Sequence, residues 1–126
     1  MKKLLAGFFL LPVSLLAAGP EITFIESIHE FGNVKENGGP VNYDFKFVNT
    51  GDSPLVILSA IASCGCTTPT YPEKPVQPGD TATINVRYNP KGRPGEFNKT
   101  VVVKSNATKD SRSRVRIKGF VLPQNK

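Results

Sequence analysis

The sequence predicts an all-β fold, an immunoglobulin-like antiparallel β-sandwich of seven to eight strands. Seven short apolar stretches are separated by turn residues, and none of them has the period of a helix. Residues 41–47 and 82–88 alternate apolar and polar side chains, which is the pattern of a strand with one buried face. Eleven prolines and eleven glycines are available for the turns. Short strands at regular spacing with such turns are typical of this sandwich.

The expected strands are short. In chain order they cover residues 22–25, 29–34, 41–47, 55–62, 82–88, 100–103 and 115–121. Residues 55–62 are nearly all apolar, which predicts a strand buried on both faces. The facing of residues 100–103 stays open because three valines are consecutive. Near the C-terminus we expect Val115, Ile117 and Val121 to point into the core.

The core has to form without tryptophan and without a disulfide between distant segments. Its aromatic packing is expected from five side chains, namely Phe24, Phe31, Phe45, Phe47 and Tyr88. Burying one such side chain contributes about 1.5–3 kcal/mol, so a handful of them can hold one domain of this size.

Residues 1–18 are expected to be a signal peptide. Lys2 and Lys3 precede an apolar run that ends in small residues, with cleavage near Ala18. The run is shorter than the roughly 20 residues that span a membrane, and no second run of that length follows. We therefore expect one immunoglobulin-like domain over residues 19–126, exported to the periplasm or secreted, with no stable membrane span after cleavage.

The net charge is +6, and it falls to +4 when the two lysines of the signal are removed. A scattered excess of this size does not predict nucleic-acid binding, so no nucleic acid is expected as a partner. The sequence shows no phosphate-binding loop, no paired carboxylates and no zinc-ligand spacing. No cofactor is expected.

The two cysteines of the chain, Cys64 and Cys66, stand one residue apart in the segment SCGCT. A disulfide between them would close a three-residue loop, which contributes only about 1.6 kcal/mol in the chain-entropy model. An extended strand would hold their Cα atoms about 7 Å apart, at the limit for a bridge, so the backbone would have to kink at Gly65. Such a bridge is a poor staple and a candidate for thiol–disulfide exchange.

Two other interpretations of the cysteines stay open. Two thiolates could hold Cu(I), although the mature chain lacks methionine and has His29 as its single histidine. If the strand over 55–62 continues unbroken, Cys64 and Cys66 lie on its core-facing side as small buried hydrophobes. A thiol hydrolase that pairs a cysteine with His29 lacks an identifiable orienting acid or amide.

Four basic residues near the C-terminus repeat with a period of two: Arg112, Arg114, Arg116 and Lys118. On a strand they would form one basic stripe on the outward face. The stripe is a candidate contact for anionic glycan or lipid headgroups. The alternative is an ordinary solvated face, whose charges also discourage aggregation between sheet edges.

Five stretches in a fixed order carry a resemblance to a known family. They are HEFG at 29–32, FKFVNTG at 45–51, SCGCT at 63–67, PG at 78–79 followed by Ile84, Val86 and Tyr88, and GRPGEFNKT at 92–100. The set resembles a bacterial exported family catalogued as a domain of unknown function, whose signature is Cys-Gly-Cys. This family is distantly similar to Hydin-type immunoglobulin-like modules and to the pilus-chaperone sandwich. The resemblance implies a seven- or eight-stranded sandwich in the periplasm and no established activity.

We expect a non-enzymatic module of the bacterial cell envelope that binds or assembles another component through its loops or a sheet edge. The partner would be an envelope protein or glycan. The alternative function is thiol–disulfide exchange or Cu(I) binding at Cys64 and Cys66. Exposure of the sulfurs discriminates between these functions, because an exchange site needs at least one accessible sulfur.

Overall fold

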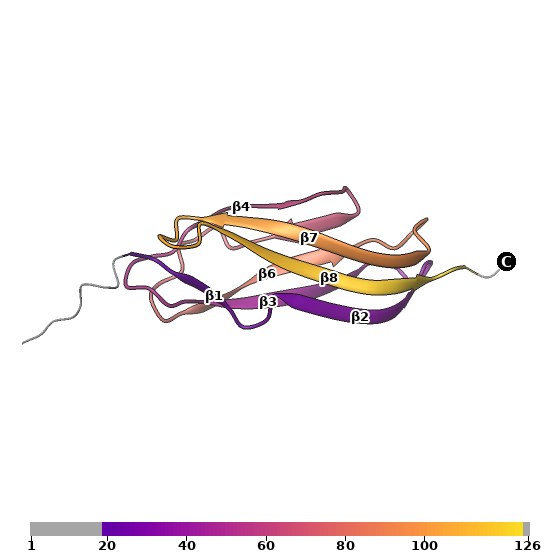
Figure 1. Ribbon diagram of the computed structural model, residues 1–126, viewed down its shortest axis with the longest axis horizontal. Coiled ribbons are helices and arrows are strands. Elements are labelled where there is room, and N and C mark those ends of the chain that lie inside the picture. Colours follow the sequence, from indigo (N-terminus) through magenta and orange to yellow (C-terminus); the bar gives the residue numbers. More distant parts are fainter. Residues whose placement is uncertain (1–18, 125–126) are drawn as a thin grey trace, which may run out of the picture.

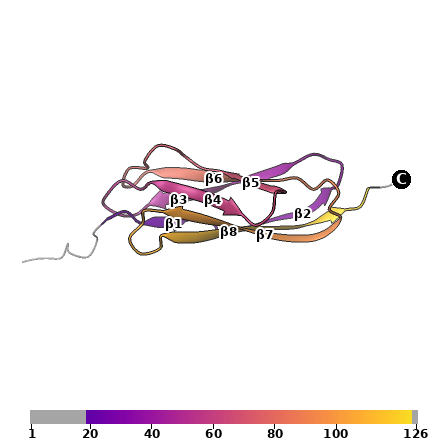
Figure 2. The same cartoon turned by 90° about the horizontal axis from the view of Figure 1, so that it is seen from above.

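The computed structural model describes residues 19–124, and all of its regular secondary structure is β (Figure 1). The expected signal peptide over residues 1–18 lies outside the described residues. Eight strands form two sheets that pack face to face, and the two layers are seen from above in Figure 2. Residues 19–124 contain no helix that is long and apolar enough to cross a membrane.

Each sheet has four strands. Sheet A has the order β1-β3-β6-β5, and sheet B has the order β2-β8-β7-β4. The strands are β1 (Ile22–Phe24), β2 (Ile28–Lys35), β3 (Val41–Asn49), β4 (Ile57–Ala62), β5 (Thr67–Thr70), β6 (Thr81–Tyr88), β7 (Gly95–Ser105) and β8 (Arg112–Leu122). The expected immunoglobulin-like sandwich of seven to eight strands is therefore confirmed.

One strand pair departs from the antiparallel arrangement. The chain leaves sheet A after Phe24 and enters sheet B at Ile28, so the N-terminal segment is divided between the two sheets. As a result β2 runs parallel to β8, whereas the other named pairs are antiparallel. The pairing of β2 with β8 is interrupted by a bulge between Glu30 and Asn33, where Gly32 has a positive φ of 74°.

The expected alternation near the C-terminus is confirmed. Val115, Ile117 and Val121 are fully buried between the sheets. The register of β7 resolves the facing of its three valines, because Val101 and Val103 are buried and Val102 is half-buried on the other face. Strand β5 was not expected from the sequence, since its four residues are mostly threonine and include Pro69.

The expectation for residues 55–62 is wrong. The regular strand starts at Ile57, and β4 is the last strand of sheet B rather than an interior strand (Figure 1). The side chains of Leu58 and Ile61 are 55% and 60% exposed. A continuous apolar run therefore marks here a strand with an apolar outer face, because hydrophobicity alone does not distinguish a central strand from an edge strand.

The core contains the expected aromatic side chains and one more. Phe45, Phe47 and Tyr88 are buried, while Phe24 and Phe31 are half-buried against them. The unexpected member of the core is Phe97 of β7, whose ring stacks on that of Tyr88 at a centroid distance of 4.2 Å. The opposite residue on β8 is Gly119, and a Cβ at that position would lie 2.7 Å from the Phe97 ring.

A buried amide at the end of β3 connects three segments of the chain. Asn49 is fully buried, and its side-chain nitrogen donates hydrogen bonds to the carbonyl oxygens of Ser53 (2.7 Å) and Val76 (2.9 Å). Its side-chain oxygen accepts hydrogen bonds from the backbone N–H of Gly51 (2.9 Å) and Glu21 (3.4 Å). One side chain therefore links the segment before β1, the loop that leads to β4 and the connection between β5 and β6.

Removing this amide should destabilise the domain strongly. We expect Asn49→Ala to lower the free energy of unfolding by about 2–4 kcal/mol, because backbone groups in the interior lose their hydrogen-bond partner. The matched control is Asn42→Ala, which removes an exposed asparagine of the same strand and should change stability by less than about 0.5 kcal/mol. Urea unfolding of both variants measures the difference, and equal losses would show that the Asn49 amide is not the link described here.

Candidate functional site

The Cys-Gly-Cys segment forms the crossing from one sheet to the other. Strand β4 of sheet B ends at Ala62, and β5 of sheet A begins at Thr67. Between them the chain turns, and the N–H of Thr67 donates a hydrogen bond to the carbonyl oxygen of Cys64 at 3.3 Å. The cysteines therefore lie where the chain leaves one edge strand and enters another.

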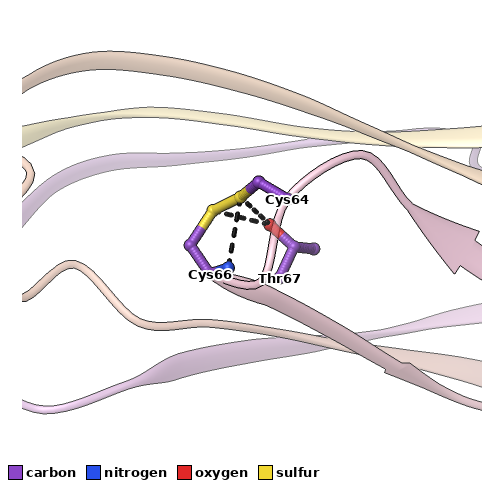
Figure 3. Close-up of a disulfide and its surroundings, with 3 residues drawn as sticks. All are labelled: Cys64, Cys66 and Thr67. Atoms are coloured by element: carbon purple, nitrogen blue, oxygen red, sulfur yellow. Dashed lines mark hydrogen bonds between the residues drawn. A yellow bond between two sulfur atoms is a disulfide. The ribbon is translucent and has the colours of Figure 1, made fainter.

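Cys64 and Cys66 are joined by a disulfide (Figure 3). Their Cα atoms are 5.3 Å apart, which is shorter than the spacing in an extended strand and within the usual range for a bridge. The interpretation in which the strand continues unbroken through both cysteines is therefore wrong. The turn after Ala62 supplies the close approach that an extended backbone would not allow.

Gly65 does not play the conformational role expected for it. It is not among the glycines of the described chain that have a positive φ, and a Cβ built on it would meet no other atom within 4 Å. The turn therefore does not depend on a conformation that only glycine adopts. What Gly65 provides is an exposed position without a side chain beside the disulfide.

The two sulfur-bearing residues differ in burial. Cys66 is 5% exposed and belongs to the hydrophobic core, whereas Cys64 is half-buried and packs against that core. The two cysteines are therefore neither both exposed nor both buried. Access from solvent is greater at Cys64, so an incoming thiolate would meet Cys64 first.

Thr67 is the polar neighbour of the disulfide (Figure 3). Its hydroxyl oxygen lies 3.5 Å from Sγ of Cys66 and 3.9 Å from Sγ of Cys64, and the residue is only 4% exposed. The N–H of Cys66 donates a hydrogen bond to Sγ of Cys64 at 3.2 Å. Thr67 was part of the segment singled out from the sequence, but its contact with sulfur depends on the turn and was not anticipated.

His29 lies far from the cysteines in the topology of sheet B. It belongs to β2 at one edge of the sheet, while the Cys-Gly-Cys turn follows β4 at the other edge. Its ring stacks on that of Tyr43 at 3.7 Å. The Tyr43 hydroxyl donates a hydrogen bond to Glu26, and this bond raises the pKa of the phenol above its usual value. The fold therefore does not bring His29 to the thiols as a base or a metal ligand.

The described part of the chain holds no cluster of three or more histidine, cysteine, aspartate or glutamate side chains suited to a metal ion. Cu(I) binding would need both sulfurs as thiolates, and the disulfide holds them bonded to each other. Cu(I) binding therefore stays a prediction about the reduced protein.

The basic residues of β8 lie on the outer face of sheet B. Arg112, Arg114 and Arg116 are exposed, and Lys118 is half-buried. The register adds a cation that the sequence analysis missed, because Lys104 of β7 lies directly opposite Arg112. The structure thus places these five cations on one face. Contact of this stripe with an anionic ligand stays a prediction.

The two four-stranded sheets, together with an N-terminal segment shared between them, form an immunoglobulin-like sandwich similar in fold to a PapD-like domain. The chain belongs to the family described as protein of unknown function (DUF1573), whose model matches residues 22–121. The resemblance stated from the five sequence stretches is thereby confirmed. No curated protein matches the sequence.

Solved structures with a similar fold share little sequence with the chain. A protein of unknown function from Porphyromonas gingivalis W83 superposes with a TM-score of 0.71 at 14% identity, covering 92% of this chain and 53% of that one. PapD-like domain 7 of human CEP192 gives a TM-score of 0.63 at 11% identity, covering 91% and 96%. The periplasmic chaperone SfaE gives 0.54 at 16% identity, covering 82% and 58%. These similarities show the fold, and the chain spans about half the length of the P. gingivalis protein.

Two glycines of family-like stretches should respond differently to a methyl group. Gly65→Ala should change the free energy of unfolding by less than about 0.5 kcal/mol, because its Cβ would point into open space. Gly51→Ala should cost about 1–3 kcal/mol, because its Cβ would clash with the backbone of residues 19–21. Urea unfolding of the two oxidised variants tests this contrast. A loss at Gly65 as large as that at Gly51 would mean that the Cys-Gly-Cys turn does need glycine.

Proposed function

We propose that the chain is an exported, non-enzymatic binding and assembly module of the bacterial cell envelope, which receives an extended segment of a partner protein at the β4 edge. The observation that carries this proposal is that β4 is an edge strand whose residues from Ser59 to Ala62 carry no charge, proline or bulge. Edge strands expose unpaired N–H and C=O groups, and proteins normally shield them with charges, proline, bulges or very short length.

The other three edges of residues 19–124 have such protection. Strand β1 has three residues, and β5 has four residues that include Pro69. Strand β2 carries Glu30 and Lys35 and is bent by the bulge near Gly32. By contrast, β4 has the sequence ILSAIA, without charge, proline or glycine, and its one bulge lies at its start, between Ile57 and Ser59. Its edge is therefore the one best suited to accept another strand.

The side chains of β4 indicate what the incoming strand would contact. Ala60 and Ala62 are half-buried beside the core, and their small size leaves room for larger apolar side chains of the partner. Ile61 points to the outer face, where it is 60% exposed. The carbonyl of Leu58 accepts a hydrogen bond of 3.4 Å from the Tyr71 hydroxyl near the start of the edge. The favoured partner is therefore an extended, apolar peptide segment.

Two features support export. The first is the expected signal over residues 1–18. The second is the environment of Gly19, whose N–H donates a hydrogen bond of 2.7 Å to the carboxylate of Asp52 and lowers the pKa of that carboxyl. Cleavage after Ala18 would turn this N–H into an α-ammonium group, and the contact would become a charge-assisted hydrogen bond. The fold neighbours SfaE, a periplasmic chaperone, and the E. coli chaperone DraB are consistent with such a location.

Strand addition at β4 can be tested with peptides selected from a random eight-residue library on the exported protein. We expect the selected peptides to protect the amides of β4 from hydrogen exchange, and Ile61→Lys to weaken their binding by about tenfold or more. The matched control is Thr68→Lys on the β5 edge, which should leave the affinity unchanged. Protection of another edge, or equal binding by the Ile61→Lys variant, would exclude β4 as the binding edge.

A second candidate function is thiol–disulfide exchange, which is favoured by the half-buried Cys64 beside the open position of Gly65. A thiolate of a partner dithiol protein would attack Sγ of Cys64, forming a mixed disulfide and releasing Sγ of Cys66 as a thiolate. The Thr67 hydroxyl, 3.5 Å from that sulfur, can donate a hydrogen bond to it. The partner's second thiolate would then attack the mixed disulfide, so that the partner is oxidised by two electrons and this chain is left with two thiols.

Redox titration of the protein purified from the periplasm tests this second function. After thiol alkylation, the intact mass of the protein identifies the first residue of the mature chain. The mass added by alkylation gives the fraction of protein whose disulfide is reduced. An exchange site should have a midpoint of about −120 to −230 mV, whereas an inert structural disulfide lies below about −300 mV. Thr67→Val should slow reduction, and Thr68→Val, at an exposed neighbour, should not. Adding Cu(I) with a competing chelator to the reduced sample tests the metal alternative.

A further inference from the structure

The two outer faces of the sandwich differ in chemistry. The outer face of sheet A is polar, with threonines, asparagines and the isolated charges Asp44, Lys46 and Arg87. The outer face of sheet B carries six cations. Lys35 of β2 lies at one end, opposite Leu122, and the other five, Lys104, Arg112, Arg114, Arg116 and Lys118, form the set named here the cationic face. Large apolar side chains surround these cations, namely Ile28, Leu58, Ile61, Phe120 and Leu122. This combination is confined to one side of the domain.

The strand register sets the cations side by side. Lys104 lies opposite Arg112, which joins two positive charges in one row across β7 and β8. In the next row Arg114 lies opposite Val102. Along β8 the side chains at alternate positions follow one another at about 6.6–6.8 Å, so the positive charge is continuous along the strand. Such a concentration of like charge attracts an anionic partner.

Acidic side chains lie only near the ends of the cationic face. Glu30 of β2 lies opposite Lys118, and Glu96 of β7 lies opposite Phe120. At the other end, Asp110 belongs to the loop that joins β7 and β8. The strand neighbours of Arg116 are Ile28 and Thr100, neither of which carries charge. The middle of the face therefore keeps its positive charge.

The apolar side chains flank the cations on the same surface. Ile28 is 52% exposed and lies directly beside Arg116, while Ile61 is 60% exposed at the β4 side. Phe120 is 43% exposed and continues the alternate positions of β8 beyond Lys118. Exposed apolar side chains that gather on one side of a domain and are rimmed by polar residues mark a contact surface. A partner has to offer negative charge and an apolar layer together.

We propose that the outer face of sheet B binds the surface of a membrane that contains anionic phospholipid. The phosphates of such a surface match the cations, and the region beneath the headgroups accepts Ile28, Phe120 and their neighbours. A second copy of the chain would be repelled by its own cationic face. A soluble anionic glycan matches the charges but has no apolar layer for the flanking side chains. This site adjoins the β4 edge proposed for the partner segment and shares Ile61 with it, but its cations lie on β7 and β8.

Vesicle sedimentation with the full exported protein tests the site. The vesicles consist of phosphatidylcholine alone or of two parts phosphatidylcholine and one part phosphatidylglycerol. We expect binding only to the vesicles with phosphatidylglycerol, and weaker binding at high salt. Replacing Arg112, Arg114 and Arg116 with glutamine should weaken binding about a hundredfold, since each surface cation contributes about fivefold. The control replaces Lys46 and Arg87 of sheet A with glutamine and should bind like the wild type.

A second pair of variants separates lipid from other anions. Ile28→Ser and Phe120→Ser should each weaken binding to the anionic vesicles, by up to about tenfold. Neither should change binding to heparin, a soluble polyanion without an apolar layer. The proposal is overturned if no vesicle is bound, which would leave an acidic protein as the partner of this face. It is also overturned if the arginine variant binds the anionic vesicles like the wild type. If both serine variants leave vesicle binding unchanged, the apolar side chains do not contribute, and the partner of this face would be a polyanionic glycan rather than a membrane.

Discussion

The hydrogen bonds of the buried Asn49 side chain hold together the segments that lead into the edge strands β1 and β4. Its nitrogen donates a hydrogen bond to the carbonyl of Val76, and that carbonyl also accepts the N–H of Leu55 at 2.9 Å. Leu55 is fully buried and lies two residues before β4. The amide thus fixes the direction in which the chain leaves β3 and enters the edge of sheet B. A side chain that bonds four buried or part-buried backbone groups is costly to replace, because most of these groups would lose a hydrogen-bond partner.

The crossing between the sheets is organised locally rather than by a long-range staple. The disulfide of Cys64 and Cys66 closes a loop too short to restrict the unfolded chain greatly, so its effect on global stability is small. Burial between the sheets supplies most of the stability, and the stack of Tyr88 on Phe97 occupies one part of that interior. The bridge is therefore free to serve a chemical or binding role, since the fold does not require it as a crosslink.

The surface of the domain is asymmetric in two independent ways. One of the four sheet edges, β4, carries neither charge nor proline and has its bulge only at its start. One of the two outer faces combines cations with exposed apolar side chains. Both features belong to sheet B. The proposed contact with a partner segment and the proposed contact with a membrane would therefore lie next to each other, at the β4 edge and on the adjoining face. Sheet A would then face away from the membrane.

The sequence by itself determined the sandwich, the inward valines and isoleucine of β8 and the outward arginines, because alternation along a strand is a local property. It also pointed to the Cys-Gly-Cys segment. Only the tertiary structure decided that β4 is an edge strand, that Lys104 joins the arginines and that Thr67 contacts the sulfurs. These facts depend on which strands become neighbours and in what register. Pairing between distant segments is set by packing of the whole domain, so the side-chain pattern of a single strand does not show which strand becomes its neighbour.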